Sequence, residues 1–182
     1  MKILAISGSL RKNSLNTQLL KTVAEFVDEG TSIELFDLAD IPFYNGDLDG
    51  ETKPAQVQAL IDAIADADGM LIATPEYNYS IPGVLKNAID WASRPAFNSV
   101  MRGKPTGVIS SSMSTLGGAR AQIHLRDILA ATLTPVYLAP DFALASAHTA
   151  FDEEGRLVDE NTRGFLQKYI AGYTQWVASQ RG

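Results

Sequence analysis

Lys2–Ser7 reads KILAIS and runs directly into the polar stretch Gly8–Asn16, GSLRKNSLN. The first stretch is apolar on both faces, which predicts a central strand of a parallel sheet. After the polar stretch, apolar residues between 19 and 27 recur at helical spacing. A buried strand, a polar loop and an amphipathic helix in this order predict the first unit of an α/β fold.

The same alternation continues along the chain. Further strands are predicted over residues 33–38, 70–73, 106–110 and 135–138. Of the predicted helices after the first, one begins at Pro54, another includes residues 84–91 and a third spans residues 119–131. The last predicted helix has its apolar positions between 165 and 177 on one face. Five such units predict a single domain over residues 1–182, with a three-layer flavodoxin-like fold and a five-stranded parallel sheet of order 2-1-3-4-5. Ligands of such folds bind beyond the carboxyl ends of the strands, so function is expected in the loops after strands one, three and four.

Composition excludes several classes of function. The 182 residues are 46% hydrophobic and 20% charged, as in an ordinary globular protein. A formal charge of −6 without a basic run argues against nucleic acid or an anionic membrane as the main partner. The absence of cysteine excludes disulfides and thiolate metal sites. Two histidines are too few for a histidine-rich metal site, so no metal is expected. No apolar run reaches the roughly 20 residues of a membrane span, and no signal-peptide core is seen, so we expect the cytoplasm.

The first loop, Gly8–Asn16, has the chemistry of an anion site. It is rich in hydroxyl and amide donors and leads into a helix N-terminus, where free N–H groups and the helix dipole favour negative charge. Ser9, Ser14 and Asn16 can donate to phosphate oxygens, and Arg11 adds a planar charged fork. The loop matches neither the Walker pattern nor the dinucleotide fingerprint. The alternative is a plain helix cap beside a solvated arginine.

The second loop, residues 74–83, reads TPEYNYSIPG and is stiffened by two prolines. Tyr77 and Tyr79 offer flat apolar area with a polar tip, and Glu76 and Asn78 can bond the edge of a heterocycle. The alternative is a well-packed turn with Tyr77 in the core.

The third loop, residues 110–120, reads SSSMSTLGGAR. Its small residues allow a backbone to approach a flat ligand, and its glycines allow positive φ. A flexible linker has a similar composition, but linkers do not usually stand between a buried strand and an amphipathic helix.

An anion cradle, an aromatic wall and a glycine-serine wall together suit a phosphorylated planar ring. FMN fits better than ATP, because no magnesium ligands lie near the phosphate loop.

Three segments carry a resemblance to a known family: Gly8–Asn16, PEYNYSIPGVLKNAIDWASR at Pro75–Arg94, and GGARAQIHLRDILA at Gly117–Ala130. They resemble the NADPH-dependent FMN reductase family, with the bacterial chromate and quinone reductases as the most similar branch and azobenzene reductases as relatives. Relatives often carry glycine where this chain has Ser114. The resemblance implies FMN as cofactor, NADPH or NADH as co-substrate, and a homodimer or homotetramer. The cofactor-binding residues it implies, together with the loop chemistry, are Ser9, Arg11, Ser14, Leu15, Asn16, Pro75, Glu76, Tyr77, Asn78, Ser111, Gly117 and Gly118.

The expected activity is an FMN-dependent NAD(P)H oxidoreductase. Hydride would pass from NAD(P)H by way of the flavin to a small-molecule electron acceptor, such as a quinone, an azo compound, chromate or free flavin, and no catalytic acid or base is named. The alternative is a flavodoxin-type electron carrier that oxidises no nicotinamide. A signalling domain of the same topology is disfavoured, because Ser7-Gly8-Ser9 stands where such a domain needs acidic residues. His124 and Asp90 are interpreted as surface or structural residues, and the aromatic residues of the last helix as its core face.

Overall fold

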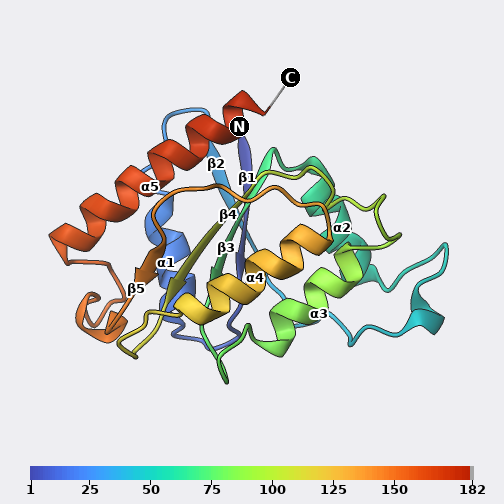
Figure 1. Cartoon of the computed structure of the whole chain (residues 1–182), viewed down its shortest axis with the longest axis horizontal. Helices are drawn as coiled ribbons and strands as arrows, with labels where there is room; N and C mark the ends of the chain where they lie inside the picture. Colours follow the sequence, from blue (N-terminus) through green and yellow to red (C-terminus); the bar gives the residue numbers. More distant parts are fainter. Residues whose placement is uncertain (181–182) are drawn as a thin grey trace.

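A computed structural model describes residues 1–180 of the chain; the last two residues of the predicted domain lie outside that range. Its centre is a parallel sheet with the strand order β2-β1-β3-β4-β5, as the sequence predicted (Figure 1). The strands are β1 (Lys2–Ser7), β2 (Ser32–Phe36), β3 (Gly69–Thr74), β4 (Thr106–Ser111) and β5 (Phe142–Leu144).

Helices cover both faces of the sheet and divide the core in two (Figure 1). One face carries α2 (Ala55–Asp66), α3 (Gly83–Ala92) and α4 (Ala119–Ala131), and the other carries α1 (Leu15–Val23) and α5 (Glu160–Ser179). The middle strands β3 and β4 are buried along their whole length, because each is flanked by strands and covered by helices on both sides.

The winding of the chain brings three loops together. The chain runs from β1 to β2 on one side and then crosses to β3 on the other, so its direction reverses between β1 and β3. Ser7 is paired with Ala73, and Thr74 with Ser110, at the carboxyl ends of these strands. The loops that follow β1, β3 and β4 therefore emerge side by side, at the place where open α/β sheets bind ligands.

The fifth strand lies later in the chain than predicted. Over the predicted strand, residues 135–138, only Val136 forms a bridge, to Thr106, whereas β5 pairs with the second half of β4. Tyr137 has another role: its ring lies 5.4 Å from the Tyr169 ring and packs against α5. Pro140, which has no N–H for a ladder, separates the bridge from β5. The segment 135–138 therefore combines a single parallel bridge to the start of β4 with the packing of Tyr137 against α5.

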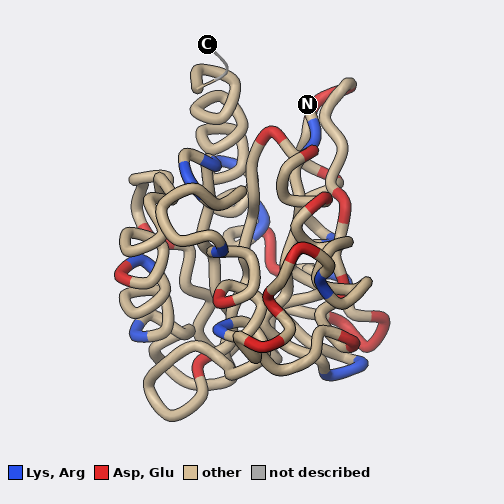
Figure 2. The backbone as a smooth tube through the Cα atoms, turned by 90° about the vertical axis from the view of Figure 1, so that its right-hand side faces the viewer, with Lys and Arg blue, Asp and Glu red and all other residues tan. Residues whose placement is uncertain are grey.

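Within the described residues, no helix combines the length and the apolar character that a membrane span requires. Basic and acidic positions are interspersed along the backbone of this part of the chain (Figure 2).

Candidate active site in three loops

The N-terminus of α1 has the serine cap that the sequence offered as the alternative to a phosphate contact. Ser14 is its N-cap, and the Ser14 hydroxyl oxygen accepts a hydrogen bond of 3.3 Å from the Thr17 N–H. The N–H groups of Leu15 and Asn16 in the first turn have no acceptor among residues 1–180. Together with the positive end of the helix dipole, they form a place that favours an anion.

Arg11 extends this anion site on the side of β1. The Ser9 hydroxyl accepts a hydrogen bond from the Arg11 N–H at 3.4 Å, which fixes the backbone just before the helix. The side chains of Arg11 and Lys12 form neither an ion pair nor a hydrogen bond within the described part of the chain. Two adjacent cations without partners, in a chain with a net charge of −6, leave positive charge free for a ligand.

Asn16 joins the first loop to the third. Its side-chain amide donates to the Ser111 carbonyl at 3.0 Å and accepts from the Ser111 N–H at 2.9 Å, and both residues are buried. The side chain of Asn16 is therefore occupied, in contrast to the expected donation to phosphate, and only its N–H is free. The Ser111 hydroxyl is buried and has no hydrogen-bond partner among residues 1–180.

The second loop is a tight hairpin turn. The N–H and carbonyl groups of Tyr77 and Ser80 are paired at 3.0 Å in both directions. Between them, Asn78 and Tyr79 have φ values of 51° and 66°, which is the pattern of a type I′ turn. A tyrosine in the left-handed region is strained, and such strain is concentrated at functional sites. The Arg120 guanidinium covers the Tyr79 ring at 4.1 Å.

Glu76 connects the second loop to α4. Its carboxylate accepts hydrogen bonds from the N–H groups of Arg120 at 3.1 Å and Ala121 at 3.4 Å, and lies 3.5 Å from the Arg120 guanidinium. The helix has no side-chain cap of its own, because its N-cap residue is Gly118. Glu76 supplies the missing acceptor, a role that differs from the predicted bond to a heterocycle.

The two glycines of the third loop are required by protein packing. A Cβ atom on Gly117 would lie 2.5 Å from the Ala143 carbonyl oxygen, and one on Gly118 would lie 2.9 Å from the Ser110 Cβ. Both residues have positive φ, 60° and 91°. The glycines thus let the loop pass close to β4 and β5, whereas the sequence suggested that they make room for a ligand. At Ser114, where relatives often carry glycine, the carbonyl accepts from the N–H of Ser146, which pins the loop to the chain after β5.

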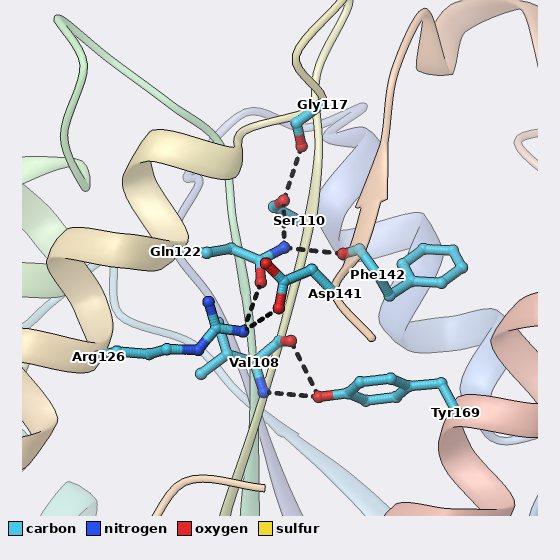
Figure 3. Close-up of polar contacts among 8 residues, drawn as sticks. All are labelled: Val108, Ser110, Gly117, Gln122, Arg126, Asp141, Phe142 and Tyr169. Carbon is cyan, nitrogen blue, oxygen red and sulfur yellow. Dashed lines mark hydrogen bonds and ion pairs between the residues drawn. The ribbon is translucent and has the colours of Figure 1, made fainter. Parts of the chain in front are cut away.

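A buried polar network holds this loop in place (Figure 3). Gln122, fully buried in α4, donates to the Ser110 hydroxyl at 2.7 Å and to the Phe142 carbonyl at 2.8 Å. Ser110 in turn donates to the Gly117 carbonyl at 2.6 Å, and Arg126 donates to the Gln122 amide oxygen at 3.2 Å. One side chain therefore ties α4 to β4, to β5 and, through Ser110, to the third loop. Sequence reasoning missed Gln122, because a glutamine in an amphipathic helix resembles a surface residue.

Tyr169 makes a separate buried polar contact from α5 to the backbone of β4 (Figure 3). Its hydroxyl accepts from the Val108 N–H at 3.1 Å and donates to the Val108 carbonyl at 3.0 Å, and burial raises the pKa of Tyr169 to about 12. Tyr169 and Tyr173 are buried, and Trp176 packs beside them, which confirms the predicted core face of the last helix.

The remaining polar residues singled out in the sequence lie at the surface. Asp90 pairs with Lys86 at 2.6 Å, one helical turn away. His124 is exposed, with its Nδ1 atom 3.1 Å from the Ser80 hydroxyl.

One cavity of about 170 Å³ lies between the three loops. Nine of the twelve predicted residues line it: Ser9, Arg11, Ser14, Leu15 and Asn16 from the first loop, Pro75, Glu76 and Tyr77 from the second, and Ser111 from the third. Asn78 lies outside, at the tip of its turn, and Gly117 and Gly118 lie outside because they face the sheet. Ser112 and Met113 line the cavity but were not singled out; they directly follow Ser111 in the quoted loop.

Comparison with known proteins identifies the family. Residues 1–149 match the model of a family described as NADPH-dependent FMN reductase. The chain belongs to this family. An NAD(P)H-dependent FMN reductase of Pseudomonas aeruginosa is 43% identical over 182 residues, covering 100% of this chain and 98% of that protein. A 2-hydroxy-1,4-benzoquinone reductase of a Burkholderia species is 41% identical over 181 residues, with coverages of 100% and 98%.

A solved structure supports the same assignment. The flavoenzyme NAD(P)H:(acceptor) oxidoreductase FerB from Paracoccus denitrificans superposes with a TM-score of 0.90 at 36% identity, covering 98% of each chain. The predicted family, fold and enzyme class are confirmed: this family member is an FMN-dependent oxidoreductase that uses NAD(P)H. The alternative of a flavodoxin-type carrier is correspondingly disfavoured.

Proposed function

We propose that this enzyme reduces a small quinone with electrons from NAD(P)H, using FMN held in the three-loop cavity. The observation that carries the proposal is the convergence of three unpaired polar groups on one cavity. These groups are the Arg11 guanidinium, the first-turn N–H groups of α1 and the buried Ser111 hydroxyl. Each of them lacks a partner within residues 1–180, and a phosphorylated ring with polar edges supplies partners for all three.

The phosphate of FMN belongs beside α1 in this proposal. A phosphate dianion there meets the N–H groups of Leu15 and Asn16, the Ser14 hydroxyl hydrogen and the Arg11 guanidinium. Charge-assisted hydrogen bonds of this kind are about twice as strong as neutral ones. The Ser14 oxygen already accepts from the Thr17 N–H, so its hydrogen is free to point outward.

The ring of FMN belongs between the second and third loops. Tyr77 exposes about half of its surface, 49%, and offers a flat apolar wall, while the buried Pro75 keeps the backbone stiff. The Ser111 hydroxyl can bond a polar edge of the ring, which would remove the cost of an unpartnered buried group. When bound, FMN supplies hydride acceptance from NAD(P)H and electron donation to the acceptor. Donors held rigidly beside it stabilise negative charge without reorganisation.

The small volume of the cavity favours a small electron acceptor that binds and dissociates in each catalytic cycle. At about 170 Å³, it is smaller than the roughly 300–1,000 Å³ of a complete ligand pocket, so part of the cofactor stays uncovered. An uncovered face can receive the nicotinamide and the acceptor in turn. A quinone is favoured over azo compounds, chromate or free flavin, because several similar relatives carry the name quinone reductase.

Anaerobic rapid mixing tests the proposal. NADH or NADPH should bleach the oxidised-flavin absorbance of the FMN-loaded enzyme within seconds, and added 1,4-benzoquinone should restore it. No bleaching with either nucleotide would mean that the protein is an electron carrier. Bleaching that an azo dye or chromate reverses, but benzoquinone does not, would replace quinone as the acceptor class.

We also propose that the enzyme is a homodimer or homotetramer in the cytoplasm. The apolar side chains of Tyr79, Leu116 and Ile123 are exposed on the second loop, the third loop and α4. Exposed apolar groups gathered near a site favour burial against another copy. Sedimentation velocity of the FMN-loaded enzyme should give the mass of two or four chains, and a single-chain mass would contradict this part of the proposal.

A further inference from the structure

A second cleft, of about 240 Å³, lies at the carboxyl ends of β1 and β2. We call it the β2 cleft. Ser9 and Arg11 line both this cleft and the three-loop cavity, so the first loop borders both spaces. Other lining comes from Lys12 and from residues 35–38 at the end of β2.

The walls of the β2 cleft carry three kinds of chemistry. Leu35 and Phe36 contribute exposed or partly exposed apolar surface. Lys12 contributes a cation with no partner among the described residues. Asp37 uses one carboxylate oxygen to accept from the Ala39 N–H at 2.9 Å, and its other oxygen has no partner in residues 1–180. A flat apolar group, a phosphate and a hydroxyl donor would match these three walls.

We propose that the β2 cleft binds the adenosine half of NADH. The free oxygen of Asp37 accepts from the adenine ribose 2′-hydroxyl, Lys12 attracts the pyrophosphate, and the exposed Leu35 side chain contacts the adenine. This inference rests on the proposed oxidation of NAD(P)H. In dinucleotide-binding α/β sheets, an acidic residue beyond the phosphate loop recognises the ribose in the same way.

The spacing of the strands fits a single extended dinucleotide. Neighbouring strands lie about 4.8 Å apart, so the end of β2 is about 10–15 Å from the loops that follow β3 and β4. A dinucleotide with its nicotinamide at the three-loop cavity can extend back across the first loop to the β2 cleft. The cleft is smaller than a complete ligand pocket, as expected for a site that holds only one end of a ligand.

This placement predicts that Asp37 helps to discriminate NADH from NADPH. NADPH carries its extra phosphate on the same ribose oxygen, and that dianion would lie against the Asp37 carboxylate. Like charges at close range repel, so Asp37 disfavours NADPH, while Arg11 and Lys12 in the same cleft attract the extra phosphate. Removing the Asp37 charge should therefore shift selectivity toward NADPH.

The test is the variant Asp37→Asn in the FMN-loaded enzyme. Asparagine keeps the acceptor for the Ala39 N–H, so the local turn is preserved, while the free oxygen becomes an N–H donor. We expect the ratio of kcat/KM for NADH to that for NADPH to fall about tenfold, the scale of one charged hydrogen bond. Reduced nicotinamide mononucleotide, which lacks the adenosine half, should be oxidised at an unchanged rate. The control is Asp40→Asn, which also removes one negative charge, three residues further on and outside the cleft. It should change neither the NADH-to-NADPH ratio of kcat/KM nor the rate with the mononucleotide.

Titration calorimetry with ADP-ribose separates this inference from the proposed function, because ADP-ribose has no nicotinamide to oxidise. Wild-type enzyme and Asp40→Asn should bind it equally, and Asp37→Asn should bind it about tenfold more weakly. Equal binding by all three proteins would overturn the inference even if NADH bleaches the flavin. The inference would also be overturned if Asp37→Asn left the ratio of kcat/KM for NADH to that for NADPH unchanged. The same holds if the variant oxidised reduced nicotinamide mononucleotide as poorly as it oxidised NADH. Failure of both nucleotides to bleach wild-type enzyme would refute the proposed function alone.

Discussion

At the scale of single residues, Arg11 and Ser111 share an unusual state. Arg11 is a cation without an acidic partner in a chain rich in acids, and Ser111 is a buried hydroxyl without a hydrogen bond. Both line one cavity, although 100 residues separate them. Leaving the buried Ser111 hydroxyl unpaired costs stability, and a ligand that supplies its partner would remove that cost, while the exposed Arg11 remains available for an anionic group.

Replacing Arg11 tests the phosphate end of the site. Arg11→Ala should weaken FMN binding by roughly 1.5–3 kcal/mol, because one charged hydrogen-bonding group is lost. Flavin fluorescence quenching measures the affinity. Lys168→Ala removes an exposed cation on α5, far along the chain from the three loops, and should leave the affinity unchanged. Equal affinities for Arg11→Ala and wild type would contradict the assigned role.

Replacing Ser111 tests the proposed contact with the FMN ring, because the free energy of unfolding and the FMN affinity should respond differently. In the FMN-free protein, Ser111→Ala removes an unsatisfied buried group, so the free energy of unfolding should stay equal or rise. FMN affinity should fall by about 0.5–1.5 kcal/mol, because the ligand loses a hydrogen bond. Urea unfolding without FMN and a fluorescence titration measure the two effects. A variant that is less stable yet binds FMN normally would show that Ser111 serves only the fold.

Local patterns predicted some residue roles and missed others. The cap at Ser14 and the unpaired Arg11 side chain follow from neighbouring residues, and the sequence offered them as the alternative to phosphate contacts. The roles of Asn16 and Glu76 depend on Ser111 and on the start of α4, which lie 95 and 44 residues away. No local pattern contains such partners, and both side chains were assigned to the ligand instead of to the contacts that hold the loops together.

At the scale of elements, three polar side chains hold the third loop and the elements beside it. Gln122 on α4 bonds β4 and β5, Glu76 caps α4 from the second loop, and Asn16 on α1 holds the end of β4. Fully satisfied buried networks specify one geometry, because each partner lost leaves another group unpaired. This rigidity is what a redox site needs if its donors are to be preorganised.

The contact of Tyr169 on α5 with the Val108 backbone in β4 predicts a pH dependence of stability. Burial raises the pKa of Tyr169 to about 12, whereas an unfolded tyrosine loses its proton near pH 10. Above pH 10 the unfolded chain therefore holds fewer protons than the folded chain, and the contribution of Tyr169 to stability falls as pH rises. The difference in unfolding free energy between wild type and Tyr169→Phe should shrink by about 1 kcal/mol from pH 9 to pH 11. Urea unfolding at both pH values measures it, and a constant difference would contradict the shifted pKa.

The fifth strand marks a limit of element prediction. Apolar alternation does not show how far strand pairing extends: residues 135–138 form one bridge to β4, and Tyr137 packs on α5. The other four strands were predicted within two residues at each end, because their apolar runs are enclosed by loops with clear turn and cap residues.

At the scale of the whole molecule, the architecture followed from the order of elements. Alternating strands and helices leave few topologies once crossovers must be right-handed, and five units favour a single doubly wound sheet. That topology alone brings the ends of β1, β3 and β4 together and leaves the end of β2 on the far side of the first loop. A cofactor and the far end of its reductant can therefore share Arg11 between them.

The central claim is that FMN lies in the three-loop cavity, with its phosphate at α1. The most direct measurement is a crystal structure of the protein saturated with FMN. We predict the phosphate beside Arg11 and the N–H groups of Leu15 and Asn16, and the ring between Tyr77 and Ser111. Density for FMN at any other place, or an empty three-loop cavity in a crystal that contains FMN, would contradict the account.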